Sequence, residues 1–339
     1  MTTVQCFMGR NTPNRSNGSQ RLCAQGWHSI GHSGEFTQNP RLLGCLVYSP
    51  LICKNNRALS VFAYNWGMAS LDQYLDELLS RGRAHLSAED GATALGLSPK
   101  TFAAAATRLL KKHRLASPRR GFYLILRPED RVGGAPDPVR WIDLLMNYLR
   151  LDYRVSLLRA AAFHGSSHQA AMVFQVLVPK QLRAVGIGRH RVQFVYQAQG
   201  PFAATNQADL LGQMKSETGF AKVAGVELTL LDSARYFHKV GGMNGVAQVV
   251  HDLGKSADSR KLAKAARMYE NSAVRRLGYL LEHFGHERQA NALLSFAKKA
   301  KSMKALDPSV RTLVETAGAL HEKDSKWMLV LNVPVEIDQ

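Results

Sequence analysis

The residues of this chain best suited to chemistry are basic, and they gather in one short stretch. Residues 98–121 contain seven lysines and arginines and no acidic residue: Lys100, Arg108, Lys111, Lys112, Arg114, Arg119 and Arg120. Ammonium and guanidinium groups bind phosphates and donate hydrogen bonds to base edges, so this stretch predicts an anionic partner. The alternative interpretation is a basic face that is only solvated.

The charge of the whole chain also favours an anionic partner. Its 339 residues carry a formal net charge of +18, which indicates a nucleic acid or a membrane surface. No apolar run reaches the roughly 18–20 residues of a membrane-spanning helix, so a membrane protein is not expected. The hydrophobic fraction of 45% is typical of a globular protein.

Three short helices are predicted around the basic stretch. The first begins near Ser70, where leucines recur every three or four residues, and ends at Gly82. The second is expected at Ala88–Leu95, because Ser87 can cap its start and Gly96 can end it.

The third helix is predicted from Pro99 to about His113, because Ser98 can cap it and proline is favoured at the first helical position. Its apolar face should pack on the first two helices and consists of Phe102, Ala105, Ala106 and Leu109. The opposite face is basic with a small residue at its centre, as a helix lying in the major groove requires. That face contains Lys100, Ala104, Thr107 and Lys111, flanked by Thr101 and Arg108.

A basic hairpin is predicted directly after the third helix, with its turn at Pro118–Gly121 and its return strand at Phe122–Leu126. This order of elements predicts a winged helix-turn-helix over about residues 68–127 that binds double-stranded DNA. The alternative is a winged helix used only for protein contacts. Base edges, or the phosphates beside them, are assigned to Lys100, Thr101 and Arg108. Phosphates are assigned to Lys111, Lys112, Arg119 and Arg120.

The first 67 residues do not resemble a domain. They contain a single acidic residue and show no sustained helical or strand period, so we expect a disordered or spurious N-terminal extension. They also hold all four cysteines, whose spacing fits neither a zinc site nor a compact disulfide frame. Because the rest of the chain has no cysteine, a cytoplasmic location is expected. The four are Cys6, Cys23, Cys45 and Cys53.

Residues 131–138, with the sequence RVGGAPDP, are predicted to link a domain at 68–130 to a C-terminal domain at 139–339. The latter should be mixed α/β to about residue 240 and mainly helical afterwards, which makes the chain α+β and helix-rich. Its first part is predicted to contain helices at Val139–Leu149, Val155–Phe163 and Leu230–Lys239 and strands at Met172–Val178, Val192–Tyr196 and Val226–Leu228. Its second part is predicted to contain helices near 243–253, 256–270, 272–284, 286–300 and Ser309–Leu320, and a strand at Trp327–Asn332.

Catalytic and metal-binding patterns are weak. His164 and His168 are four residues apart, but the glycine between them disfavours a regular helix and no third ligand follows at a suitable spacing. Residues 241–245, GGMNG, lack the lysine of a phosphate-binding loop. Asp232 and Arg235 are expected to form a helix surface pair or an inter-domain salt bridge. We therefore expect no enzymatic activity, no metal site and no cofactor.

Four segments in the larger domain carry a resemblance to a known family. They are LLRAAAFHGSSHQAAMVFQV, VELTLLDSARYFHKVGGMNGV, RRLGYLLEHFG and WMLVLNVPVEID. In this order, behind a winged helix-turn-helix, they resemble the AbiEi antitoxins over roughly residues 68–339. These proteins are the regulators of bicistronic type IV toxin–antitoxin systems used in phage defence.

The resemblance implies that the winged helix binds inverted repeats in the promoter of its own operon and represses it. It also implies that the C-terminal domain counteracts a toxin of the nucleotidyltransferase type, without requiring a stable complex with it. Two alternatives stay open: a nucleic-acid-modifying enzyme whose winged helix positions the substrate, and a pure interaction protein.

A second basic surface is possible in the helical part. Arg275 and Arg276 belong to a helix whose apolar face turns inward, so they are either solvated or part of a contact surface for DNA, the toxin or the toxin's RNA substrate. A group of nearby lysines favours the contact surface, with Lys301 and Lys304 beside it. The candidate surface consists of Arg275, Arg276, Lys298 and Lys299.

Overall fold

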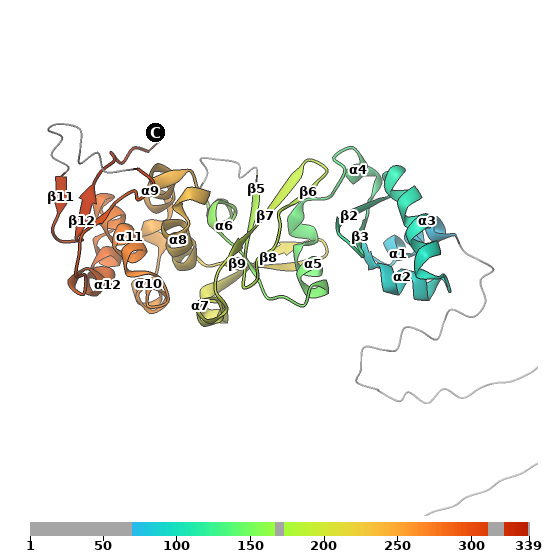
Figure 1. Cartoon of the computed structure of the whole chain (residues 1–339), viewed down its shortest axis with the longest axis horizontal. Coiled ribbons are helices and arrows are strands. Elements are labelled where there is room, and N and C mark those ends of the chain that lie inside the picture. Colours follow the sequence, from blue (N-terminus) through green and yellow to red (C-terminus); the bar gives the residue numbers. More distant parts are fainter. Residues whose placement is uncertain (1–69, 167–172, 311–321, 338–339) are drawn as a thin grey trace, which may run out of the picture. The chain divides into compact units, whose positions relative to one another are not determined.

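The structure is a computed structural model that describes residues 70–166, 173–310 and 322–337 (Figure 1). The predictions for residues 1–67 and their cysteines, for His168, and for most of the helix near Ser309–Leu320 concern residues outside these ranges. The described residues all belong to one compact unit of the chain.

Three helices open the described part of the chain. They are α1 (Leu71–Ser80), α2 (Ala88–Ala94) and α3 (Pro99–Lys111). Each begins where the sequence predicts, because a serine hydroxyl accepts a hydrogen bond from the backbone N–H three residues further on. These capping residues are Ser70, Ser87 and Ser98.

A three-stranded antiparallel sheet in the order β1-β3-β2 completes this part of the chain, with β1 between α1 and α2 and the other two strands after α3. Its strands are β1 (His85–Ser87), β2 (Leu115–Arg119) and β3 (Phe122–Ile125). The predicted hairpin is present, but its turn is shorter than Pro118–Gly121, because Pro118 lies within β2 where the register shifts. Gly121 has a φ of 80° at the turn, a conformation that favours glycine. We call residues 70–126 the N-terminal module.

The segment after the N-terminal module packs closely instead of forming an open linker. It contains α4 (Pro128–Arg131), the 3-10 turn η1 (Pro138–Arg140) and α5 (Ile142–Tyr148). The N–H of Arg189 donates to the carbonyl of Gly133 at 3.0 Å. A Cβ atom on Gly188 would lie only 2.1 Å from the same carbonyl oxygen. Two backbones therefore meet at a distance that only glycine permits.

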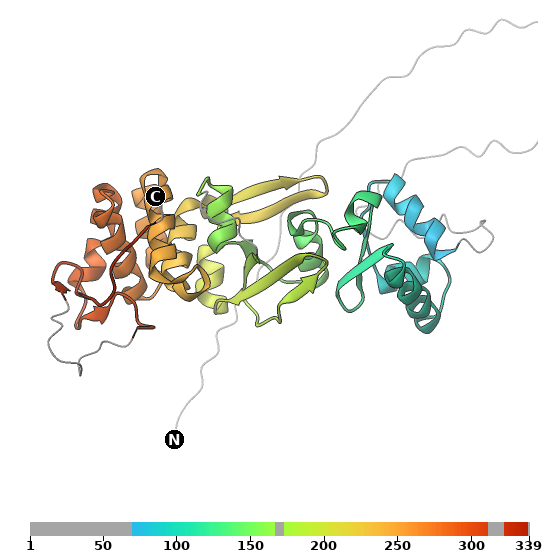
Figure 2. The same ribbon diagram turned by 90° about the horizontal axis from the view of Figure 1, so that it is seen from above.

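A six-stranded mixed sheet forms the middle of the described chain, in the order β6-β7-β5-β4-β9-β8 (Figures 1 and 2). The pairs β5–β7 and β4–β9 are parallel, and the other neighbours are antiparallel. The strands are β4 (Arg154–Val155), β5 (Val173–Val178), β6 (Val185–Ile187), β7 (His190–Tyr196), β8 (Leu211–Ser216) and β9 (Gly219–Ala224). The helical segments between them are α6 (Leu157–Phe163), α7 (Gln199–Thr205) and η2 (Ala208–Leu210).

The structure of this region differs from the prediction in three places. The helix predicted at Val155–Phe163 begins only at Leu157, because Val155 belongs to β4. The strand predicted at Val226–Leu228 is wrong, since these residues open α8 (Val226–Arg235). The hairpin β8–β9 was not predicted, because its glycines and lysines weaken the strand signal.

Helices make up most of the remaining chain, as the sequence predicts. They are η3 (Phe237–Lys239), α9 (Gly242–Leu253), η4 (Gly254–Ser256), α10 (Ser259–Ala266), α11 (Asn271–His283) and α12 (Glu287–Lys298). A small sheet in the order β10-β12-β11 follows, formed by β10 (Lys304–Ala305), β11 (Glu322–Asp324) and β12 (Leu329–Leu331). Helix α8 is central: it contacts α6, α9, α10 and α11, and every residue from Glu227 to Ala234 is buried.

One hydrophobic core runs through most of these elements. It includes Phe122, Leu124 and Leu126 from the N-terminal module together with the six-stranded sheet and the later helices. A second, smaller core lies among α1, α2 and α3 and includes Leu75 and Phe102. The described residues thus form a mixed α+β, helix-rich fold, as predicted. Within these ranges every helix is too short or too polar to cross a lipid bilayer.

Candidate functional site

Helix α3 presents the predicted basic face to solvent. Phe102, Ala106 and Leu109 are buried and Ala105 is half-buried, so the predicted apolar face packs inward. The six residues of the opposite face and its flanks are all exposed: Lys100, Thr101, Ala104, Thr107, Arg108 and Lys111. Lys112, which follows the helix and was assigned to phosphate, is exposed as well. The helical period thus separates a packing face from a free face, as the sequence predicts.

The cations of this face are not paired with any carboxylate of the described residues. Among the described residues, no carboxylate forms an ion pair with Lys100, Arg108, Lys111 or Lys112. Arg114, from the same basic stretch, instead donates to Asp72 at 2.8 Å and also pairs with Asp76, which ties β2 to α1. The positive charge on α3 is therefore available to an external anion, whereas that of Arg114 is not.

The two threonines of this face also serve the helix itself. The Thr101 hydroxyl lies 2.8 Å from the Ser98 hydroxyl at the N-cap. The Thr107 hydroxyl donates to the carbonyl of Ala103 at 2.8 Å. Each hydroxyl keeps some capacity for a further hydrogen bond, because it can both donate and accept.

The two arginines of the hairpin differ in their surroundings. Arg120 is exposed, in agreement with its assignment. Arg119 is half-buried: its guanidinium lies 5.5 Å from the centre of the Phe194 ring and donates to the carbonyl of Arg183. Burial, together with the charge of Arg183, lowers the pKa of Arg119. This placement contradicts the assignment of Arg119 to phosphate, because its side chain already packs against β7.

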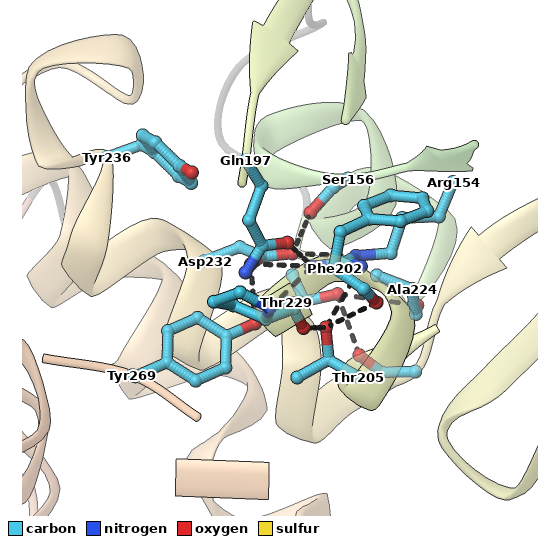
Figure 3. A network of polar contacts seen from close by, with 12 residues as sticks. Arg154, Ser156, Gln197, Phe202, Thr205, Ala224, Thr229, Asp232, Tyr236 and Tyr269 are labelled. Atoms are coloured by element: carbon cyan, nitrogen blue, oxygen red, sulfur yellow. Dashed lines mark hydrogen bonds and ion pairs between the residues drawn. The ribbon is translucent and has the colours of Figure 1, made fainter. Parts of the chain in front are cut away.

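A buried polar network lies in the region of the six-stranded sheet and α8 (Figure 3). The carboxylate of Asp232 accepts hydrogen bonds from Arg154, from the Ser156 hydroxyl at 2.7 Å and from the Tyr269 hydroxyl at 2.6 Å. Arg154 also donates to Gln197 at 2.8 Å and to Thr205 at 3.3 Å. Each carboxylate oxygen thus has two donors. The carboxylate of Asp232 is therefore fully bonded, and the network joins the sheet to the helices. One donor is left over, because the buried Nε2 of Gln197 has no hydrogen-bond partner among the described residues.

The surroundings of Arg154 favour its charged form. Burial is the largest single effect and opposes this form, but Asp232, Tyr269 and Tyr236 together outweigh it, and the pKa of Arg154 lies above its ordinary value. Burial and the same carboxylate raise the pKa of Tyr269 well above its ordinary value. Tyr269 is therefore a neutral donor, and the pair of opposite charges is held in place by neutral groups.

The sequence does not reveal this network. Spacing alone favours a pair between Asp232 and Arg235, but Arg235 pairs with Glu270 at 2.9 Å. One feature of the sequence does indicate a buried polar contact: Asp232 lies in a run of leucines and other residues that are all buried in α8. A buried aspartate requires a cationic or hydrogen-bonding partner, but its spacing does not say which one.

The arginines of α11 are also placed differently from the prediction. Arg275 and Arg276 are only 3% and 8% exposed, so they are neither solvated nor part of a contact surface. Arg275 donates to the carbonyls of Ser302 at 3.1 Å and Met328 at 2.9 Å, and Arg276 donates to that of Ala305 at 3.2 Å. They hold the chain around β10 against α11. Lys298 and Lys299 are exposed, as a contact surface requires.

The weaker candidates serve local structure. The imidazole Nε2 of His164 lies 2.7 Å from the carbonyl oxygen of Ala224. Gly241 and Gly242 have φ values of 91° and 81° and begin α9. Within the described ranges, no three histidine, cysteine or acidic side chains are grouped so that they could hold a metal ion.

Comparisons with known proteins place the region that contains the network in a family. Residues 154–283 match the family model of the AbiEi antitoxin C-terminal domain. The match begins at Arg154 and ends at the last residue of α11. No curated protein matches the chain.

A solved structure shares the fold over a longer stretch. The crystal structure of the RV2827C protein from Mycobacterium tuberculosis superposes with a TM-score of 0.54 at 16% identity. The match covers 78% of this chain and 92% of that one. The domain match supports an antitoxin role in a toxin–antitoxin system. Over residues 154–283, this chain is thus similar to the C-terminal domain of the AbiEi antitoxins.

Proposed function

We propose that the N-terminal module, residues 70–126, belongs to a winged helix-turn-helix domain that spans residues 68–130 and binds double-stranded DNA. The protein would bind inverted repeats in its own promoter and repress a type IV toxin–antitoxin operon used in phage defence. Residues 139–339, joined through 131–138, would form the antitoxin domain. This domain would counteract a nucleotidyltransferase-type toxin in the cytoplasm without a stable complex.

The observation that carries DNA binding is the free basic face of α3. Three exposed cations of α3 lie around the small residue Ala104, and Lys112 follows directly; none of the four has an ion pair with a described residue. A helix in the major groove needs such a face, because a small central residue permits close approach and the flanking cations meet the phosphates. We assign Lys100, Thr101 and Arg108 to base edges or the phosphates beside them. Phosphate contacts are assigned to Lys111, Lys112 and Arg120.

Fluorescence anisotropy on the full chain tests this assignment, with a duplex from the promoter of its own operon as the probe. Arg108→Ala should relax the preference at one base position by about 1–3 kcal/mol, and Lys111→Ala should reduce the salt slope by about 1. Arg81→Ala is the matched control, because Arg81 is an exposed cation of the same module that is already paired with Glu77. Equal binding by the wild type and by Lys100→Ala/Arg108→Ala at all salt concentrations would contradict the proposal.

The antitoxin role needs a separate test. Deleting the N-terminal module would remove Phe122, Leu124 and Leu126 from the larger core, so a truncated chain could fail for lack of folding. The better variant is full-length Lys100→Ala/Arg108→Ala, expressed from a constitutive promoter beside the toxin of the neighbouring gene. This variant should restore growth although it no longer represses. If it accumulates normally and gives no rescue, antagonism depends on DNA binding.

A C-terminal interaction surface is proposed from Lys298 and Lys299 at the end of α12. Cations at a helix C-terminus also stabilise the helix through its dipole, so a test must separate this local role from a contact with a partner. Lys298→Glu/Lys299→Glu should weaken toxin antagonism and leave operator affinity unchanged. Wild-type antagonism by this variant would remove the surface from the proposal.

A further inference from the structure

The tip of the β2–β3 hairpin fits closely against α5. The ring centres of Phe122 and Tyr148 lie 5.3 Å apart, and the Tyr148 hydroxyl donates to the carbonyl of Arg120 at 3.3 Å. A Cβ atom on Gly121 would lie 2.6 Å from that hydroxyl oxygen. The turn therefore rests directly on Tyr148, with no room for a side chain between them.

The same tip also contacts the region that matches the AbiEi domain. The guanidinium of Arg119 stacks on Phe194 of β7 and donates to the carbonyl of Arg183, just before β6. Both partners lie within residues 154–283. Arg119 is thus used to attach the hairpin to this domain and not to face solvent.

On its other side, the tip is connected to the elements proposed to bind DNA. The carbonyl of Gly121 accepts a hydrogen bond of 2.8 Å from the N–H of Ala88, the first residue of α2. The side chain of Arg120 is exposed. The hairpin tip is therefore bonded to α5, to the AbiEi domain and, through the Gly121 carbonyl, to the start of α2, while the side chain of Arg120 is exposed.

We propose that Tyr148 of α5, and Arg119 through its stack on Phe194 of the AbiEi domain, are positioning residues that set the orientation of Arg120 and so the affinity for DNA phosphates. The inference rests on the proposed DNA-binding function. A backbone that is already ordered loses less conformational entropy when its side chain binds a phosphate, so the contacts at the tip increase affinity without touching DNA.

A double-mutant cycle on the full chain tests the route through Arg120, with the promoter duplex as the probe. Tyr148→Phe removes only the hydroxyl and should weaken binding about threefold to tenfold, in keeping with the loss of one hydrogen bond. In the Arg120→Ala background the same change should have no effect. Effects that simply multiply would overturn the proposal, because Tyr148 would then act independently of Arg120. Tyr196→Phe is the matched control, since Tyr196 is 45% exposed and its hydroxyl has no hydrogen bond among the described residues.

Hydrogen exchange of the full chain without DNA tests the contact itself. Tyr148→Phe and Phe194→Leu should raise the exchange rates of the backbone amides at residues 119–121, and Phe194→Tyr, which keeps the ring, should restore them. Unchanged rates in the first two variants would overturn the proposal. A third outcome is that the exchange rates at residues 119–121 rise in the variants while the wild type binds no duplex. The proposed DNA-binding function and the positioning role would then both be wrong, but the contact of the hairpin tip with Tyr148 and Phe194 would be supported.

Discussion

Arg154 donates two hydrogen bonds of 3.1 Å to the two carboxylate oxygens of Asp232, and neither side chain is exposed to solvent. Arg154 belongs to β4 and Asp232 to the central helix α8, so the pair joins the six-stranded sheet to the helices. It is also the contact between the first residue of the AbiEi match and its most buried helix. The family domain is therefore organised around a charged pair within its core.

Replacing Asp232 should destabilise the protein strongly. Asp232→Asn leaves the guanidinium of Arg154 buried without a counter-charge, which typically costs about 3–5 kcal/mol of the free energy of unfolding. Urea unfolding followed by circular dichroism measures this change. Lys264→Ala is the control, because it removes an exposed ion pair with Asp209 and should cost about 0–1 kcal/mol. Equal stability of the two variants would mean that the pair contributes no more than a surface contact.

The contact between Gly278 and Trp327 predicts a second large effect. A Cβ atom on Gly278 would lie 2.1 Å from a ring carbon of the fully buried Trp327, so Gly278→Ala forces the indole or α11 to move. Overpacking of this kind costs about 1–3 kcal/mol. Gly200→Ala is the matched control, because Gly200 is also helical and has open space at its Cβ position. Urea unfolding should show a loss only for Gly278→Ala, and a loss of the same size for both would contradict the packing argument.

The helices and the free face of α3 were predictable because their causes are local. A capping serine, a proline at the first helical position and a helical period act within a few residues, so Ser98 and Pro99 place the start of α3 correctly. The free face follows from the same period once the apolar residues are turned inward.

Contacts between distant residues were not predictable in this way. Asp232 and Arg154 are 78 residues apart, and spacing alone favoured Arg235 as the partner. In the sequence nothing distinguishes Arg119 from its neighbour Arg120. In the structure Arg119 donates to the carbonyl of Arg183, 64 residues away, whereas Arg120 is exposed. The same holds for α11, where the burial of Arg275 and Arg276 depends on carbonyls from a later part of the chain.

Arg275→Met should therefore affect stability and not nucleic-acid affinity. Methionine keeps much of the packing volume but leaves the carbonyl of Ser302 without the Arg275 donor, which costs about 1–3 kcal/mol. The carbonyl of Met328 loses the same donor but keeps the N–H of Lys304. Lys299→Met, on the exposed end of α12, should stay within about 0.5 kcal/mol. The salt dependence of duplex binding should not change in Arg275→Met. A reduced salt slope at unchanged stability would restore Arg275 to an exposed contact surface.

His85 should make the N-terminal module sensitive to acid. Its ring stacks on Phe122 at 5.7 Å, and burial, with a contribution from Arg83, lowers the pKa of His85 below its ordinary value of 6.5. In the unfolded chain this histidine therefore binds its proton at a higher pH than in the folded state. As the pH falls below about 6.5, the unfolded state holds more protons than the folded state. The stability that His85 contributes is therefore lost as the pH approaches the lower pKa of the folded state.

The variant His85→Phe tests this prediction, because it keeps a ring on Phe122 but cannot titrate. Its free energy of unfolding should fall less than that of the wild type between about pH 7 and pH 5. Since the two proteins differ at residue 85 alone, parallel pH profiles would exclude His85 as a source of acid sensitivity.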